Sequence, residues 1–301
     1  MDNKVKKIEE LKKELNAVIL VHNYQPAEIQ DIADYSGDSL GLSEEAASTD
    51  ADVIIFCGVD FMAETAKILS PDKTVILPVK EATCPMANMI TAADLRKFKA
   101  EYPEAIVISY VNTTAEVKAE SDICCTSANA VKVTSSVGEN EVIFTPDKNL
   151  ANYVSKHVNK RIIPWQGYCP VHDSITVEDI KKARELYPDA VFMAHPECRP
   201  EVLKFADHVV STGGMFTVVE KDDSKSFIVG TEEGIIYPLK KKYPDKEFIP
   251  VRPGIVCVNM KKMTLDRVIE SMEELSPEIE VPENIIEKAS HALNRMLDIS
   301  R

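Results

Sequence analysis

The chain has 301 residues, 45% of them hydrophobic and 28% charged, and this composition predicts a globular protein of two or three domains. The net charge of −14 argues against binding to nucleic acid or to an anionic membrane surface, so an anionic substrate must be held by local groups. Residues 4–10 are mostly charged, and no apolar run reaches the ~18 residues of a membrane helix, so we expect a cytoplasmic protein without a membrane partner.

Three similar units follow one another along the chain. Their first strands are predicted at 18–21, 106–109 and 191–194, their second at 53–57, 142–145 and 227–229, and their third at 75–78, 162–164 and 248–250. Helices alternate with these strands, which predicts an α/β fold of three homologous three-layer αβα domains with parallel sheets. We expect the domains at 1–88, 89–173 and 174–263, and two C-terminal helices within 264–301 that pack back on the body.

One cysteine lies after the third strand of each unit, at Cys84, Cys169 and Cys257. Each precedes by seven residues a threonine that opens a charged amphipathic helix, so all three occupy one register. Functional groups in parallel sheets gather beyond the carboxyl ends of the strands. Three such edges that face inward would form a pseudo-three-fold arrangement with the three cysteines together at its centre.

Other polar residues recur in the same register. A triplet follows each first strand: His22-Asn23-Tyr24, Tyr110-Val111-Asn112 and His195-Pro196-Glu197. Each unit also has an aspartate (Asp34, Asp122 and Asp207), a hydroxyl (Ser39, Ser127 and Thr212) and an acidic residue after the second strand (Asp60, Asp147 and Glu232). These matched offsets in three units indicate internal repeats.

Seven cysteines, an odd number at low density, do not indicate a disulfide framework. Three thiolates from separate repeats also differ from a zinc finger, whose ligands come in local pairs. They suit a 4Fe-4S cluster with three cysteine ligands and one open iron that acts as a Lewis acid. The alternative, that they are small buried residues, is disfavoured by their shared register. The cysteines without counterparts in the repeats, expected in the core, are Cys57, Cys124, Cys125 and Cys198.

The repeated hydroxyls lie where a loop enters a helix, a place where backbone N–H groups bind carboxylates or phosphates without a lysine. The alternative interpretation is that they are ordinary helix caps. The triplets supply proton donors and acceptors on strand-end loops. His172, three residues after Cys169, is a candidate contact to the substrate or to a metal ligand, and the repeated aspartates are interpreted as structural.

Together these motifs resemble those of the quinolinate synthase family over nearly the whole chain. The matching segments are 22–24, 37–39, 58–64, 82–87, 110–112, 125–130, 169–172, 195–198, 211–213 and 257–261. The resemblance implies three similar α/β domains around a 4Fe-4S cluster bound by Cys84, Cys169 and Cys257. It also implies a step of NAD biosynthesis, the condensation of iminoaspartate with dihydroxyacetone phosphate to quinolinate, with loss of phosphate and two waters.

By position, the resemblance places substrate contacts at His22, Ser39, Tyr110, Asn112, Ser127, His195, Glu197 and Thr212. Candidate acid/base groups are Tyr24, His195 and Glu197, and a separate aspartate-oxidising enzyme would supply the iminoaspartate. Two alternatives stay open: a diphthamide-type radical S-adenosylmethionine enzyme and a non-enzymatic iron–sulfur sensor. The His-Asn-Tyr and His-Pro-Glu-Cys loops favour the quinolinate synthase interpretation, and the sequence offers no DNA-binding segment to carry the output of a sensor.

Overall fold

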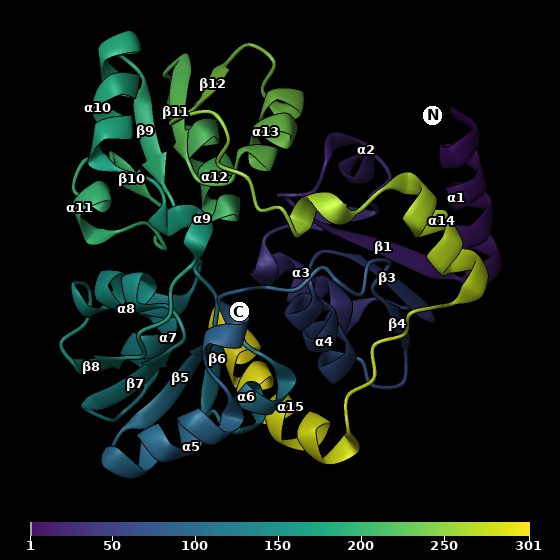
Figure 1. The fold of residues 1–301 in the computed structure, drawn as a ribbon, viewed down its shortest axis with the longest axis horizontal. Coiled ribbons are helices and arrows are strands. Elements are labelled where there is room, and N and C mark those ends of the chain that lie inside the picture. The colour runs from purple at the N-terminus through teal and green to yellow at the C-terminus, as the bar shows by residue number, and fades with distance from the viewer. Residues whose placement is uncertain (1) are drawn as a thin grey trace.

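The computed structural model describes residues 2–301, which contain three four-stranded parallel sheets seen as three lobes in Figure 1. The first sheet has β1 (Ala17–His22), β2 (Tyr35–Gly37), β3 (Val53–Cys57) and β4 (Thr74–Ile76). The second has β5 (Ile106–Tyr110), β6 (Ile123–Cys125), β7 (Glu141–Thr145) and β8 (Arg161–Pro164). The third has β9 (Val191–Ala194), β10 (His208–Val209), β11 (Ser226–Gly230) and β12 (Glu247–Pro250). The predicted α/β fold with three parallel-sheet units is confirmed.

The helices repeat in a similar order. The first unit has α1 (Asp2–Leu15), α2 (Ala27–Gln30), α3 (Ser39–Ser48), α4 (Asp60–Leu69) and the short 3-10 helix η1 (Ala87–Met89). Next come α5 (Ala92–Glu101), α6 (Ala115–Ala119), α7 (Ala130–Ser136), α8 (Lys148–Ser155) and α9 (Pro170–Asp173). The third set is α10 (Val177–Leu186), α11 (Pro200–Leu203), α12 (Thr212–Lys221), η2 (Glu233–Ile235), α13 (Ile236–Lys242) and η3 (Met260–Lys262), before α14 (Leu265–Glu274) and α15 (Glu283–Ser300).

The three sheets share one topology, with strand orders β2-β1-β3-β4, β6-β5-β7-β8 and β10-β9-β11-β12. Their central strands are mostly hydrophobic, and all five residues of β3 and of β5 are buried. Continuous apolar strands rich in valine and isoleucine are typical of parallel sheets covered by helices on both faces. The carboxyl ends of these strands therefore project their loops from rigid, buried supports.

Each sheet also contains a short second strand that the sequence analysis did not predict. These strands, β2, β6 and β10, have three, three and two residues. Segments of this length carry no measurable alternation of polar and apolar residues, and they lie at the sheet edges where only one neighbour constrains their sequence. The prediction of three strands in each unit was therefore wrong, because each sheet has a fourth strand at its edge.

The repeated aspartates hold these edge strands against the first strand of each sheet. Their carboxylates accept a backbone N–H from the first strand, in the pairs Asp34–Ile19, Asp122–Val107 and Asp207–Phe192, each at 2.8 Å. The backbone N–H of each aspartate donates to the carbonyl oxygen of the same strand residue. The structural role predicted for these aspartates is confirmed.

The two C-terminal helices pack on different parts of the body. Helix α14 lies against α1, and α15 contacts α6, β6, α4 and α7, which places the end of the chain between the first and second lobes (Figure 1). The domain boundaries predicted near 88, 173 and 263 stay predictions. Within residues 2–301, no helix combines the length and the apolar character of a membrane span.

Candidate active site

A cavity of about 70 Å³ lies among the loops of all three units. Its lining includes every residue that the sequence analysis named as a ligand, an acid/base group or a substrate contact. These residues are His22, Tyr24, Ser39, Cys84, Tyr110, Asn112, Ser127, Cys169, His172, His195, Glu197, Thr212 and Cys257. The fold thus collects them in one place, while the role of each remains a prediction.

Each of the three cavity cysteines begins a single helical turn. The carbonyl oxygens of Cys84, Cys169 and Cys257 accept the N–H of the residue four positions later, at 3.3, 2.9 and 3.3 Å. Each sulfur also receives the N–H of the residue three positions later. Burial raises the pKa of the Cys84 thiol to about 12, and these N–H groups oppose that rise by favouring the thiolate. The turns are thus built to support the form of sulfur that binds metals.

The position and chemistry of these three thiols fit an iron–sulfur cluster. They are free and partly exposed, and they also line a second hollow of about 290 Å³ on the surface, beside Pro85 and Pro170. The remaining cysteines are free and buried in the core, as predicted: Cys57, Cys124, Cys125 and Cys198. Three thiols from three units, reachable from both the cavity and the surface, form a donor set suited to a cluster that contacts a substrate.

A carboxylate lies behind each of these cysteines and accepts its backbone N–H. The pairs are Asp60–Cys84 at 3.2 Å, Asp147–Cys169 at 3.2 Å and Glu232–Cys257 at 3.1 Å. These acids occupy the repeated position after the second strand of each unit. The sequence analysis found the repeat but assigned these residues no role.

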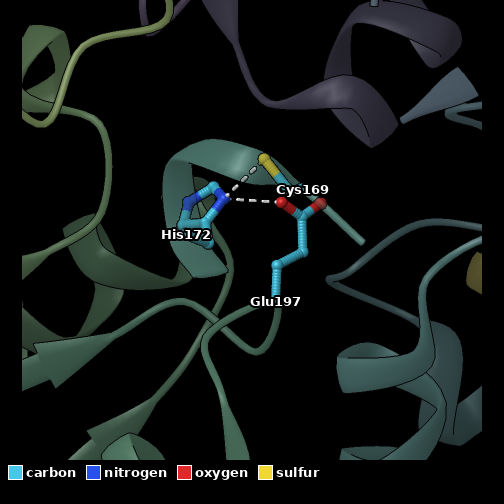
Figure 2. Close-up of side chains that lie close together, drawn as sticks. All are labelled: Cys169, His172 and Glu197. Carbon is cyan, nitrogen blue, oxygen red and sulfur yellow. Dashed lines mark hydrogen bonds and ion pairs between the residues drawn. The ribbon is translucent and has the colours of Figure 1, made fainter. Parts of the chain in front are cut away.

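His172 joins the second cysteine turn to the third unit (Figure 2). Its Nδ1 lies 3.2 Å from Sγ of Cys169 and 2.6 Å from Oε2 of Glu197. The donor atoms of these three residues lie within 4.8 Å of one another, close enough to share a metal ion. The shorter distance is that of a hydrogen bond, however, and an Nδ1–H that donates to Glu197 accounts for the grouping without an ion.

Glu197 is one of three acidic residues that line the cavity, with Asp38 and Glu232. Burial of the Glu197 side chain disfavours the charged form, but hydrogen bonds from His172 and Tyr110 are among the contacts that lower the pKa of the carboxyl. Tyr110 also hydrogen-bonds to the carboxylate, and its own pKa is raised well above the usual value by burial and by the charge of Glu197. Glu197 is therefore an ionised acceptor among neutral donors.

A path of hydrogen bonds connects Tyr24 to Glu197. The hydroxyls of Tyr24 and Thr231 lie 2.6 Å apart, and Oγ1 of Thr231 lies 2.7 Å from Nε2 of His172. In the neutral tautomer whose Nδ1 donates to Glu197, Nε2 of His172 accepts, and the protons then run from Tyr24 through Thr231 to His172. The path crosses all three units and ends at the carboxylate.

The other two cavity histidines are oriented by their own backbones. Nδ1 of His22 accepts the N–H of Tyr24 at 3.2 Å, and Nδ1 of His195 accepts the N–H of Glu197 at 3.3 Å. Burial lowers the pKa of both histidines to about 3. Both are therefore neutral with the proton on Nε2, and in His195 this atom lies 3.2 Å from Oγ of Ser127.

The three repeated hydroxyls line the cavity but do not cap their helices. The N-cap residues are Asp38, Asn129 and Ser211, each next to or near the repeated hydroxyl. Ser39 and Thr212 are instead the first residues of α3 and α12. The alternative that these hydroxyls are ordinary caps is therefore wrong, because a neighbouring side chain occupies the cap position.

The sequence analysis did not identify two residues near the cavity, Thr231 and Lys261. Thr231 has Val59 and Pro146 at the equivalent positions, so the repeat pattern gave no sign of it, and its only signal was adjacency to Glu232. Lys261 lies 2.9 Å from Oε1 of Glu232 and contacts the backbone oxygen of Tyr24, which connects the third cysteine turn to the first unit. It belongs to the segment 257–261 that carried the family resemblance.

Comparison with known proteins identifies the family of this chain. The family model described as quinolinate synthetase A protein matches residues 6–298. Quinolinate synthase 2 of Methanosarcina acetivorans is 53% identical over 97% of this chain and 94% of its own length. The quinolinate synthase of Dehalococcoides mccartyi is 55% identical, and that of Geobacter sp. strain M21 is 53% identical, each over 98% of this chain and 97% of its own length. The chain therefore belongs to the quinolinate synthetase A protein family.

Proposed function

We propose that this enzyme condenses iminoaspartate with dihydroxyacetone phosphate and releases quinolinate, phosphate and two waters. The observation that carries the proposal is the single cavity in which three thiols, three hydroxyls and the hydrogen-bonded path to Glu197 meet. The reaction needs anion binding, several proton transfers and activation of a leaving hydroxyl. The cavity lining offers a group for each of these tasks.

Membership of the family implies use of an iron–sulfur cluster. We assign its ligands to Cys84, Cys169 and Cys257, and its type to a 4Fe-4S cluster with one iron free of protein ligands. When bound, such a cluster supplies a Lewis acid that faces the substrate. The N–H groups at the sulfurs and the carboxylates behind the three turns support this assignment.

The repeated hydroxyls, which lie at or shortly before helix starts, are assigned to substrate binding. Ser39, Ser127 and Thr212 present hydroxyls beside backbone N–H groups and would hold carboxylates or phosphate, which a chain of net charge −14 must do locally. Oδ1 of Asn112 is buried and has no hydrogen-bond partner among residues 2–301. This acceptor suits a substrate N–H or O–H, because a buried polar atom without a partner is costly.

The remaining polar groups are assigned to orientation and proton transfer. Nε2–H of His22 is available to donate, and Tyr110 is a protonated donor held by Glu197. Glu197 exchanges protons with the substrate, and the path from Tyr24 through Thr231 and His172 delivers protons toward its carboxylate. His195 orients Ser127 through Nε2. The partners are thus two small molecules, with an aspartate-oxidising enzyme as the source of iminoaspartate.

The test is quinolinate formation by anaerobically purified, cluster-reconstituted protein supplied with both substrates. We expect product only from the loaded enzyme, and none from a Cys84→Ser variant. A loaded cluster that yields no quinolinate would contradict the assigned reaction. The next assay would then be S-adenosylmethionine cleavage, the reaction expected of a diphthamide-type radical enzyme.

A further inference from the structure

We propose that Asp60, Asp147 and Glu232 are positioning residues that fix the three cysteine turns in the geometry a cluster requires. The inference rests on the proposed cluster site and extends it to a second layer of residues. In each unit the carboxylate follows the second strand and accepts the N–H of the cysteine that follows the third strand. The same contact occurs three times in separate units, which a chance hydrogen bond would not do.

Each carboxylate binds a second backbone group at the start of the adjoining helix. Asp60 accepts the N–H of Phe61 at 2.8 Å, and Glu232 accepts the N–H of Gly234 at 2.7 Å. Asp147 accepts the N–H of Asn149 at 2.7 Å. The carboxylate thus ties a loop that carries a thiol to a helix packed on the sheet, so the rigidity of the sheet extends to the sulfur.

The three carboxylates make these contacts with different numbers of oxygens. Asp60 uses Oδ1 for both the helix and the cysteine. Asp147 uses Oδ1 for the helix and Oδ2 for the cysteine, and Glu232 uses Oε2 for the helix and Oε1 for the cysteine. An amide side chain has only one acceptor oxygen, so it can replace Asp60 but not the other two.

Glu232 carries a further constraint. Lys261 lies 2.9 Å from Oε1 of Glu232 and also contacts the backbone oxygen of Tyr24. A glutamine at position 232 would present an NH₂ group either to the N–H of Gly234 or to the N–H of Cys257, and it would lose the charge that holds Lys261. Of the conservative variants, Glu232→Gln should therefore disturb the turn of Cys257 most.

The experiment compares iron loss from reconstituted holoenzyme to the chelator bathophenanthroline, which can approach through the surface hollow that the three cysteines line. Loss of a residue that positions metal ligands costs about 10- to 100-fold in metal affinity, and we expect Asp60→Ala and Glu232→Gln to lose iron faster by a similar factor. Asp60→Asn should retain iron within about twofold of the wild type, because its single oxygen preserves both contacts. The matched control is Asp122→Ala, which removes a similar carboxylate contact to a backbone N–H, that of Val107, outside the three cysteine turns.

The possible outcomes distinguish failure of the positioning role from failure of the cluster assignment. Wild-type protein that binds no iron and sulfide would overturn the cluster assignment itself. If the wild type binds a cluster but Glu232→Gln and Asp60→Ala lose iron no faster than it does, only the positioning role is overturned. The positioning role is also overturned if Asp122→Ala loses iron as fast as these two variants. If Asp60→Ala does not fold, the ratio between Glu232→Gln and Asp60→Asn decides: we expect at least a fivefold difference in the rate of iron loss, and equal rates would contradict the inference.

Discussion

The cysteine turn of the second unit and those of the first and third have the same backbone but different chemistry. In all three, the residue three positions after the cysteine donates its N–H to the sulfur. That residue is Ala87 in the first turn, Met260 in the third and His172 in the second. Only the side chain of His172 among them is a proton carrier, and it reaches both Glu197 and Thr231.

This difference separates two tasks that the cavity combines. Features common to all three repeats, namely the cysteine, its N–H bonds and the carboxylate behind it, serve the symmetric task of holding one cluster. Features present in a single repeat, such as His172 and Glu197, serve the asymmetric task of proton transfer to one substrate. Variants of the three cysteines and of the carboxylates behind them should therefore change cluster content, and variants of His172 and Glu197 should change turnover.

The largest effect on turnover is expected from Glu197→Gln. The amide keeps the shape of the side chain but cannot accept a proton, and loss of a positioned acid/base group typically slows a reaction about 10²- to 10⁴-fold. Steady-state quinolinate formation measures the loss, and iron and sulfide analysis should show wild-type cluster content. Full turnover in this variant would remove Glu197 from the chemistry.

The next effect is expected from His172→Ala, compared with Met260→Ala at the same position of the third turn. Removing the imidazole interrupts the path between Thr231 and Glu197, and we expect kcat to fall roughly 10²-fold with little change in cluster content. The Met260 variant keeps the path and should stay far closer to wild-type kcat. Equal losses in the two variants would contradict the distinction between the turns.

A smaller effect is expected from Thr231→Val, which removes the hydroxyl between Tyr24 and His172 but keeps the shape of the side chain. Loss of one hydrogen-bonded link should lower kcat about tenfold. Thr231→Ser restores the hydroxyl and should recover most of the activity. A serine variant as slow as the valine variant would indicate that Thr231 acts through packing alone.

The smallest effect on turnover is expected from Asp122→Ala, which changes a shared residue that is not among those lining the cavity. It leaves the N–H of Val107 without its acceptor, so the free energy of unfolding should fall by about 1–3 kcal/mol in chemical denaturation. Quinolinate formation per folded chain should remain at the wild-type level. A large fall in kcat would show that the edge strand of the second unit influences the cavity.

The fold and much of the cavity lining could be predicted because they are repeated. Cys84, Cys169 and Cys257 share one register, as do the hydroxyls, so each supports the interpretation of the others. Thr231 could not be predicted, because a threonine occurs at this position in only one of the three units. The edge strands could not be predicted, because segments of two or three residues show no pattern of polar and apolar residues. The contact of a carboxylate with each cysteine N–H also depends on loops that only tertiary packing brings together.

The central claim is that thiols from three separate repeats bind one cluster. It is tested most directly by iron and sulfide content after anaerobic reconstitution of Cys84→Ser, Cys169→Ser and Cys257→Ser, with Cys57→Ala as the matched control in the core. We predict about four irons per chain in the wild type and in the control, and a marked loss in each of the three serine variants. Wild-type content in any serine variant, or an equal loss in a folded Cys57→Ala protein, would contradict the claim.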